Sequence, residues 1–220
     1  MAALPSVIGI RDFRGRLSIG NVTVGLDEKG VPSPVPSEQA PASYVGRPEL
    51  TDNLLAFLLS DEPAPKGRAI ATAVYGLGGI GKTTAVRWLT WRPEIEQRFC
   101  DGRIWITVGD EPPDAIVKIT DCVSQLDPLV KIKASEEAAR ADLAAVLQDK
   151  SVLFVIDDVW PGKSAEVAKA LIVPSARSRF LLTTRFPDLA DDIQARAFPY
   201  PSGEYRGRLD VRRCRRTLPR

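Results

Sequence analysis

A glycine-rich octet at residues 76–83, GLGGIGKT, constrains the fold of this chain more than any other feature. An apolar run at residues 69–75 leads directly into it, and residues 83–90 follow it with the spacing of a helix. Four glycines in six positions permit backbone angles that leave no room for a Cβ atom, so successive N–H groups can point inward. The segment therefore predicts a buried strand, a tight loop and a helix, the opening unit of a parallel α/β sheet.

The octet fits the pattern G-x-x-x-x-G-K-[ST], known as the P-loop, and each part of the pattern has a chemical use. Inward N–H groups and the positive end of the following helix attract phosphate oxygens. Lys82 supplies a cation for the β- and γ-phosphates, and the Thr83 hydroxyl is a ligand for Mg²⁺. We expect ATP or ADP with Mg²⁺ here, and not merely a glycine turn with a chance lysine. The expected cofactor-binding residues in this segment are Gly76, Gly78, Gly79, Ile80, Gly81, Lys82, Thr83 and Thr84.

A second apolar run, residues 153–156, ends in the two carboxylates Asp157 and Asp158. Many strands end in a solvated aspartate, but this one follows the P-loop lysine by about 75 residues in an α/β pattern. In that context Asp157 is expected to reach the magnesium through water, which makes Thr83 and Asp157 the predicted metal residues. Asp158 is then placed to polarise an attacking water if hydrolysis occurs.

Arg185 directly follows another strand candidate, residues 180–184. A guanidinium at that position could reach the γ-phosphate and report its presence. The alternative is a surface arginine at a strand end. Together with Asp157 and Asp158, it completes the candidate catalytic set.

The remaining periodicity predicts a P-loop NTPase fold of the α/β class, a parallel sheet with helices on both faces. Segments rich in β-branched and aromatic residues indicate further strands, and segments of helical spacing lie between them. The expected strands are 103–108 and a short one at 195–200, and the expected helices are 48–59, 114–126, 135–147 and 164–171.

Three regions follow from composition along the chain. Residues 1–43, with four prolines between positions 32 and 41, are expected to be a flexible leader or linker. Loose alternation over residues 16–26 suggests a weak hairpin within it. Residues 44–200 form the nucleotide-binding domain. Residues 201–220 are a basic, irregular tail with seven arginines and two acidic residues, so the rest of the +2 chain carries −3.

Composition also excludes several classes of function. The chain has no histidine and three widely separated cysteines, which leaves a zinc site almost no ligands. Cys100 and Cys122 are expected to be inert packing residues in a reducing cytoplasm. No apolar run is long enough to span a bilayer, so we expect no membrane partner. The basic cluster at 206–216 lacks an aromatic platform beyond Tyr205, so nucleic acid is not expected as a partner.

These motifs together resemble the NB-ARC domain of the STAND class of P-loop NTPases, which includes apoptotic-protease activating factors, plant disease-resistance receptors and bacterial relatives. The resemblance spans residues 44–200 and follows the order of motifs in the family. The matching pieces are VGR at 45–47, VYGLGGIGKTT at 74–84, Phe99, RIWI at 103–106, LFVIDDVW at 153–160 and LLTTR at 181–185.

The resemblance implies more than the spacing does. It implies that Val45 and Arg47 lie against adenine and that Arg185 senses the γ-phosphate. It also implies a switch that rests with ADP, opens on exchange for ATP, and then oligomerises and signals, with slow hydrolysis at most.

The chain departs from the family pattern after the nucleotide-binding sheet. The helical domain and the winged-helix domain with its nucleotide-contacting histidine are absent, so we expect a truncated product. Self-association or signalling partners would then depend on the missing domains. Two alternatives stay open: a catalytically active small P-loop ATPase or kinase, and a non-functional fragment.

Overall fold

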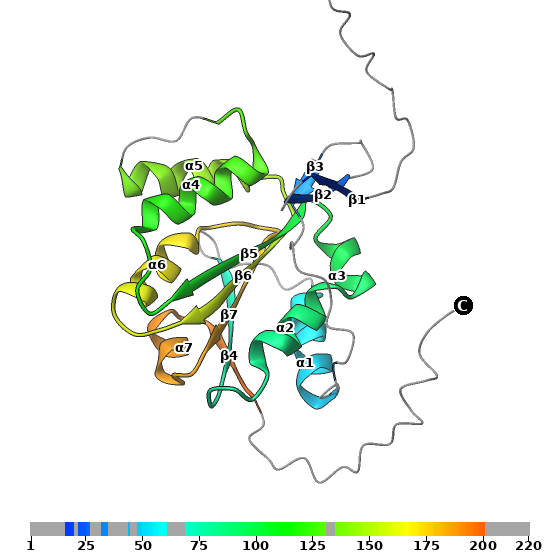
Figure 1. The fold of residues 1–220 in the computed structure, drawn as a ribbon, viewed down its shortest axis with the longest axis vertical. Coiled ribbons are helices and arrows are strands. Elements are labelled where there is room, and N and C mark those ends of the chain that lie inside the picture. Colours follow the sequence, from blue (N-terminus) through cyan, green and yellow to red (C-terminus); the bar gives the residue numbers. More distant parts are fainter. Residues whose placement is uncertain are drawn as a thin grey trace, which may run out of the picture.

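Figure 1 shows a computed structural model of the chain, which describes residues 16–19, 22–26, 32–34, 44, 48–60, 69–130 and 135–200. Its main body is a five-stranded sheet in the order β5-β6-β7-β4-β8, and every neighbouring pair is parallel. All strands expected from residue 69 onward are present, including the short last one. The strands are β4 (Ile70–Tyr75), β5 (Gly102–Gly109), β6 (Val152–Val159), β7 (Arg179–Thr184) and β8 (Arg196–Pro199).

Helices cover both faces of this sheet, which confirms the predicted α/β architecture (Figure 1). On one face lie α1 (Pro48–Leu58), α2 (Lys82–Thr90) and α3 (Pro93–Arg98). On the other lie α4 (Ala115–Leu126), α5 (Glu136–Val146), α6 (Lys163–Leu171) and α7 (Asp188–Asp192). The helices α3 and α7, of 6 and 5 residues, were not predicted, because so few residues cannot display a helical period.

The core lies on both sides of the central strands. Along β6, Phe154 and Ile156 face the side of α4 to α7, while Leu153 and Val155 face α1 to α3. A strand buried on both faces has no polar alternation, which explains its continuous apolar sequence. The rings of Phe154 and Phe180 stack across β6 and β7 with centroids 5.0 Å apart.

The strand order determines which loops meet. Strand β7 lies between β4 and β6, so three adjacent parallel strands end at the same edge of the sheet. The glycine-rich loop follows β4, the two aspartates end β6, and Arg185 follows β7. In open α/β sheets, ligands bind at this carboxyl edge. The fold thus brings the three motifs of the sequence to one place.

A separate antiparallel sheet of three short strands precedes this domain, in the order β1-β2-β3. Its strands β1 (Arg16–Ile19) and β2 (Val22–Leu26) are the hairpin suggested by the sequence, and β3 (Pro32–Pro34) pairs with β2. The rest of residues 1–43 and the tail 201–220 lie outside the described residues, so the three-region division stays a prediction. Among the described helices, none combines the length and the apolar character required to cross a membrane.

Candidate functional site

The glycine-rich loop connects β4 to α2, whose first residue is Lys82. The N-cap residue is Gly81, which has no side chain to cap the helix. The amides of the first turn therefore have no side-chain cap as a hydrogen-bond partner. Lys82 is 8% exposed, and its Nζ atom donates hydrogen bonds of 2.8 Å to the carbonyl oxygens of Gly76 and Leu77. The ammonium group therefore lies inside the curve of the loop.

Four charged side chains interact at the glycine-rich loop, those of Lys82, Arg185, Asp158 and Asp157. Burial lowers the pKa of Lys82, the nearby Arg185 lowers it further, and Asp158 and Asp157 oppose the shift. The charged lysine is thus disfavoured by the protein around it and supported by the two carboxylates. A polyanion bound beside the two cations would favour the charged form.

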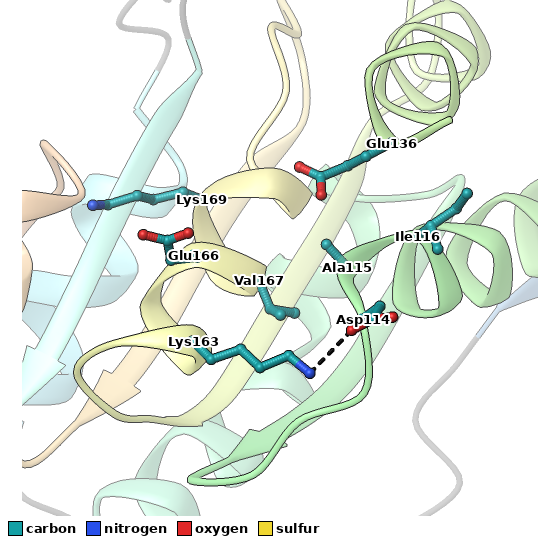
Figure 2. Close-up of a pocket in the computed structure, with 8 residues that line it drawn as sticks. All are labelled: Asp114, Ala115, Ile116, Glu136, Lys163, Glu166, Val167 and Lys169. Carbon is teal, nitrogen blue, oxygen red and sulfur yellow. Dashed lines mark ion pairs between the residues drawn. The ribbon is translucent and has the colours of Figure 1, made fainter. Parts of the chain in front are cut away.

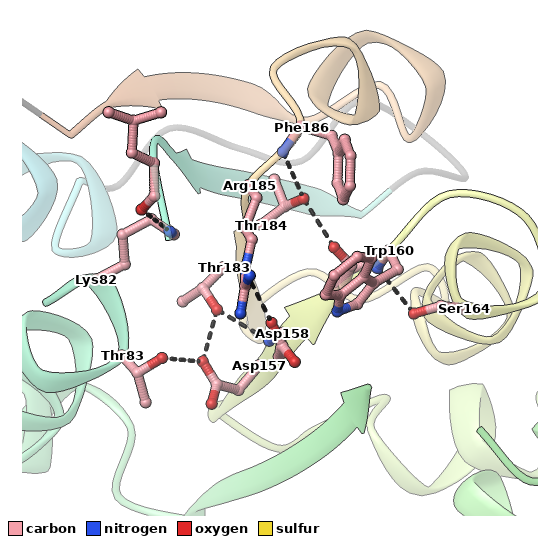
Figure 3. A network of polar contacts seen from close by, with 12 residues as sticks. Lys82, Thr83, Asp157, Asp158, Trp160, Ser164, Thr183, Thr184, Arg185 and Phe186 are labelled. Carbon is pink, nitrogen blue, oxygen red and sulfur yellow. Dashed lines mark hydrogen bonds and ion pairs between the residues drawn. The ribbon is translucent and has the colours of Figure 1, made fainter. Parts of the chain in front are cut away.

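Asp157, near the end of β6, accepts hydrogen bonds from the P-loop helix α2 and from the neighbouring strand β7 (Figure 3). The hydroxyl of Thr83, in the first turn of α2, donates a 2.9 Å hydrogen bond to Asp157 Oδ1. The hydroxyl of Thr183, on β7, donates to the same oxygen. Asp157 is 6% exposed and Thr183 is 1% exposed, so this contact is held inside the protein.

Thr83 and Asp157 fit the requirements of a Mg²⁺ ion. Magnesium takes hard oxygen ligands in an octahedron at about 2.0–2.1 Å. The Thr83 hydroxyl is 2.9 Å from Asp157 Oδ1, so the carboxylate is within reach of a water on a metal ion that the hydroxyl would ligate. Magnesium also keeps several waters and phosphate oxygens, so a hydroxyl and one carboxylate are a sufficient protein contribution.

Asp158 has an unusual backbone conformation at the end of β6. The register of β6 against β7 shifts between Ile156 and Val159, and Asp158 has a φ of 57°. Its N–H donates to Thr183 Oγ1 at 3.0 Å. Non-glycine residues seldom adopt positive φ, and among the described residues Asp158 shares it with Gln194, which lies outside the site. The bulge turns the Asp158 carboxylate toward Arg185.

Arg185 extends over the glycine-rich loop. A Cβ atom added to Gly78 would lie 3.1 Å from a terminal guanidinium nitrogen of Arg185. The Nε of Arg185 is 4.0 Å from Asp158 Oδ1, and its guanidinium carbon is 5.0 Å from the centre of the Trp160 ring. The arginine therefore lies between the loop and the acidic strand end, and 48% of its side chain is exposed.

Tyr200 supports the loop from the other side. Its backbone N–H donates a 2.7 Å hydrogen bond to the carbonyl of Tyr75, the residue before the loop. A Cβ atom on Gly76 would lie 3.2 Å from the Tyr200 Cβ, and one on Gly81 would lie 3.3 Å from its hydroxyl oxygen. Both ends of the loop thus pack against this buried tyrosine, which the sequence reasoning did not identify.

The structure brings together the five residues that the sequence analysis placed at one site, Lys82, Thr83, Asp157, Asp158 and Arg185. Sequence reasoning missed the role of Thr183, although the residue was part of the motif it quoted. The glycines 78 and 79 and Thr84 are exposed, and Ile80 packs against the core. The predicted adenine contacts Val45 and Arg47 lie outside the described residues.

A hollow of about 590 Å³ lies away from the P-loop, between α6 and the beginnings of α4 and α5 (Figure 2). Acidic and basic side chains line it together, and both lysines are paired: Lys163 with Asp114 at 3.0 Å and Lys169 with Asp192 at 2.8 Å. Its paired Lys163 and Asp114 side chains are 57% and 78% exposed, whereas Lys82 of the P-loop is 8% exposed. We therefore place the candidate site at the loop and not in this hollow.

Cys122 is buried as expected, but the expectation that Cys100 packs inside is wrong. Cys100 lies in the turn after α3, where the neighbouring Phe99 fills the core instead.

Comparison with known proteins identifies relatives of this domain. The family model described as the NB-ARC domain matches residues 49–202. Disease resistance RPP13-like protein 3 of Arabidopsis thaliana is 30% identical over 154 residues, which cover 67% of this chain and 18% of that protein. Disease resistance protein RPP13 of the same plant is 31% identical over 134 residues, covering 58% and 16%. The chain thus matches less than a fifth of the length of these relatives.

Solved structures show the same fold at low sequence identity. The ORC2 protein of Aeropyrum pernix, solved in complexes with ADPNP and ADP, has 17% identity and a TM-score of 0.51, covering 74% of this chain and 50% of that one. Cdc6p of Pyrobaculum aerophilum has 16% identity and a TM-score of 0.52, covering 74% and 47%. From the family match and the geometry of the loop, the chain belongs to the NB-ARC domain family and contains the nucleotide-binding module of that family.

Proposed function

We propose that this chain binds ADP or ATP with Mg²⁺ and acts as a nucleotide-dependent switch module of a STAND-type signalling NTPase. The observation that carries the proposal is the convergence of five residues from three separate motifs. Lys82 and Thr83 follow β4, Asp157 and Asp158 end β6, and Arg185 follows β7. Two cations and a magnesium-type oxygen pair at a glycine-rich loop suit a phosphate chain with its metal ion.

Each residue has a role in this proposal. The amides of the loop and of the first turn of α2 hold the phosphates, and Lys82 neutralises them. Thr83 ligates the metal and Asp157 holds it through water, as a buried acceptor already bonded to the Thr83 hydroxyl. Bound Mg²⁺ supplies further neutralisation of the β- and γ-phosphate charge. Arg185 is placed to distinguish a triphosphate from a diphosphate.

The contact between Asp158 and Arg185 supports slow hydrolysis, if any. A carboxylate that activates water must be free to accept a proton. The Asp158 carboxylate instead faces the Arg185 guanidinium, whose Nε lies 4.0 Å from Asp158 Oδ1. This arrangement favours a switch over a fast ATPase or a small kinase.

The wider context of the switch is also a proposal. Disease-resistance relatives suggest signalling, with self-association or protein partners engaged through parts of those proteins that this chain does not match. We assign the module to the cytoplasm on the sequence-based argument from its few, widely separated cysteines.

Thermal unfolding of the 220-residue chain with and without ligand tests the proposal. Ligand at a hundred times its dissociation constant adds about 2.7 kcal/mol, which should raise the midpoint by about 5 to 10 °C. Both MgADP and MgATP should shift the transition, GDP should do so less, and Lys82→Ala should remove the shift. Lys163→Ala, which changes an exposed lysine at the other hollow, should retain it. A cooperative transition that no adenine nucleotide shifts would contradict the proposal.

A further inference from the structure

Trp160 and Arg185 come from adjacent loops and meet at the edge of the candidate site (Figure 3). Trp160 follows β6, and Arg185 and Phe186 follow β7. The guanidinium carbon of Arg185 lies 5.0 Å from the centre of the Trp160 ring, a cation–π distance. The Phe186 ring also contacts Trp160, with centroids 5.4 Å apart and planes at 58°.

The Trp160 backbone is fixed by its neighbours. Its N–H donates a 2.9 Å hydrogen bond to Ser164 Oγ, and Ser164 is fully buried at the start of α6. The two loops are also bonded to each other, because the Thr184 hydroxyl donates to the carbonyl of Val159 at 2.8 Å. The same hydroxyl accepts from the Phe186 N–H at 3.1 Å. The Trp160 backbone is therefore held in place, and its ring, which packs on Phe186, gives the partly exposed Arg185 side chain a surface to rest on.

Arg185 needs such a platform. About half of its side chain is exposed, and its ion pair with Asp158 spans 4.0 Å, too far for a direct hydrogen bond. A long, exposed arginine loses rotamer entropy when it engages a ligand. A ring face that already restricts the guanidinium to the space over Gly78 reduces that loss.

We infer that Trp160 is a positioning residue that holds the Arg185 guanidinium over the glycine-rich loop and thereby sets the preference for a triphosphate over a diphosphate. The inference rests on the proposed function, because it requires that nucleotide binds at this loop. Trp160 acts through Arg185 and need not touch the ligand. Replacing Trp160 should therefore change the ratio of the triphosphate and diphosphate affinities. It should have a smaller effect on the stability of the fold and on the diphosphate affinity itself.

The test measures dissociation constants of MgADP and of the magnesium complex of a non-hydrolysable ATP analogue by calorimetry, on the full chain. Trp160→Leu should reduce the preference for the triphosphate about two- to fivefold, the range of one cation–π contact at a partly exposed site. Trp160→Phe, which keeps a ring face, should retain most of it. Trp160→Met replaces Leu in the comparison if the leucine variant does not unfold cooperatively. Trp105→Leu is the matched control. The guanidinium carbon of Arg87 lies 5.2 Å from the centre of the Trp105 ring, but Trp105 is on β5, which two strands separate from β4.

A double-mutant cycle separates positioning from general support of the fold. In an Arg185→Gln background, Trp160→Leu should leave the affinity ratio unchanged, since the group it positions is gone. An equal loss of both affinities in Trp160→Leu, or an unchanged ratio, overturns the inference while leaving the proposed function intact. Failure of the unmodified chain to bind either nucleotide overturns both.

Discussion

The hydroxyl of Thr83 donates a 2.9 Å hydrogen bond to Oδ1 of Asp157, although 74 residues separate them in the chain. The contact links the first turn of α2 to the end of β6, and the Thr183 hydroxyl of the neighbouring strand β7 donates to the same oxygen. In the proposed site Thr83 ligates the magnesium ion and Asp157 holds it through water. The two side chains that form this hydrogen bond are thus the two groups proposed to hold the metal.

Lys82→Ala should abolish nucleotide affinity while the domain stays folded. The variant loses a buried cation, and a charge-assisted hydrogen bond contributes about 1.5–3 kcal/mol, so the loss should be at least about 10- to 100-fold. Fluorescence or calorimetric titration with MgADP measures it, with circular dichroism to check the fold. Unchanged affinity would reject the assignment of the site.

Asp157→Ala should weaken nucleotide binding mainly when Mg²⁺ is present. Its carboxylate is expected to act on the metal and not on the phosphates themselves, so titration in EDTA should show a much smaller difference between variant and wild type. Asp192→Ala, at an exposed ion pair with Lys169, is the control and should bind as wild type does. An equal loss with and without the metal would contradict the role given to Asp157.

Asp158→Gly should be more stable than Asp158→Ala, by about 1 kcal/mol, because only glycine adopts positive φ without strain. Asp158 has a φ of 57° and Gln194 has a φ of 58°, so Gln194→Gly and Gln194→Ala form a matched pair outside the site. Urea unfolding of the four variants measures both differences. Equal stability of Asp158→Gly and Asp158→Ala would show that the backbone at position 158 is not strained in solution.

Gly76→Ala should be more destabilising than Gly79→Ala. Both glycines have positive φ, but a Cβ at position 79 meets no atom within 4 Å, whereas one at position 76 lies 2.9 Å from Ile80 Cδ1 and 3.2 Å from Tyr200 Cβ. Overpacking costs about 1–3 kcal/mol beyond the backbone strain that the two variants share. Chemical denaturation of both variants measures the difference, and equal losses would show that Tyr200 does not confine the loop.

Local sequence patterns predicted the individual elements of this fold well, because each has a local cause. The continuous apolar residues of β6 reflect burial on both faces, and the glycines of the loop reflect backbone angles that a Cβ excludes. The same local reasoning singled out Lys82, Thr83, Asp157, Asp158 and Arg185 as candidate site residues. Each of these residues lies at a strand or loop end where an isolated polar group has a chemical explanation.

The parts that the sequence did not reveal depend on tertiary pairing. Nothing in the residues of β7 states that it lies between β4 and β6, and this position makes Thr183 a partner of Asp157 and brings Arg185 over Gly78. The contact of Tyr200 with both ends of the loop likewise depends on the pairing of β8 with β4. The contact of Trp160 with Arg185 also requires the loops that follow β6 and β7 to be adjacent.

The stability of the domain above pH 9 should depend on Cys122. Burial in α4 raises the pKa of this thiol to about 12 from the ordinary 9.0, with Asp121 adding to the shift and Lys118 opposing it. Between these two values the unfolded chain releases the thiol proton and the folded chain keeps it. The free energy of unfolding should therefore fall as pH rises through this window, by about 1.4 kcal/mol per pH unit from this group, and should be unaffected by it below pH 9.

Urea unfolding at pH 8, 10 and 11 under reducing conditions, for wild type and Cys122→Ala, isolates this contribution. Other groups, Lys82 among them, titrate in both proteins, so the difference between the two curves belongs to Cys122. The advantage of the wild type over the variant at pH 8 should shrink or reverse by pH 11. Cys100→Ala removes an exposed thiol and should follow the wild type throughout. If Cys122→Ala loses stability above pH 9 as steeply as the wild type does, the thiol ionises in the folded protein and α4 does not exclude water from it.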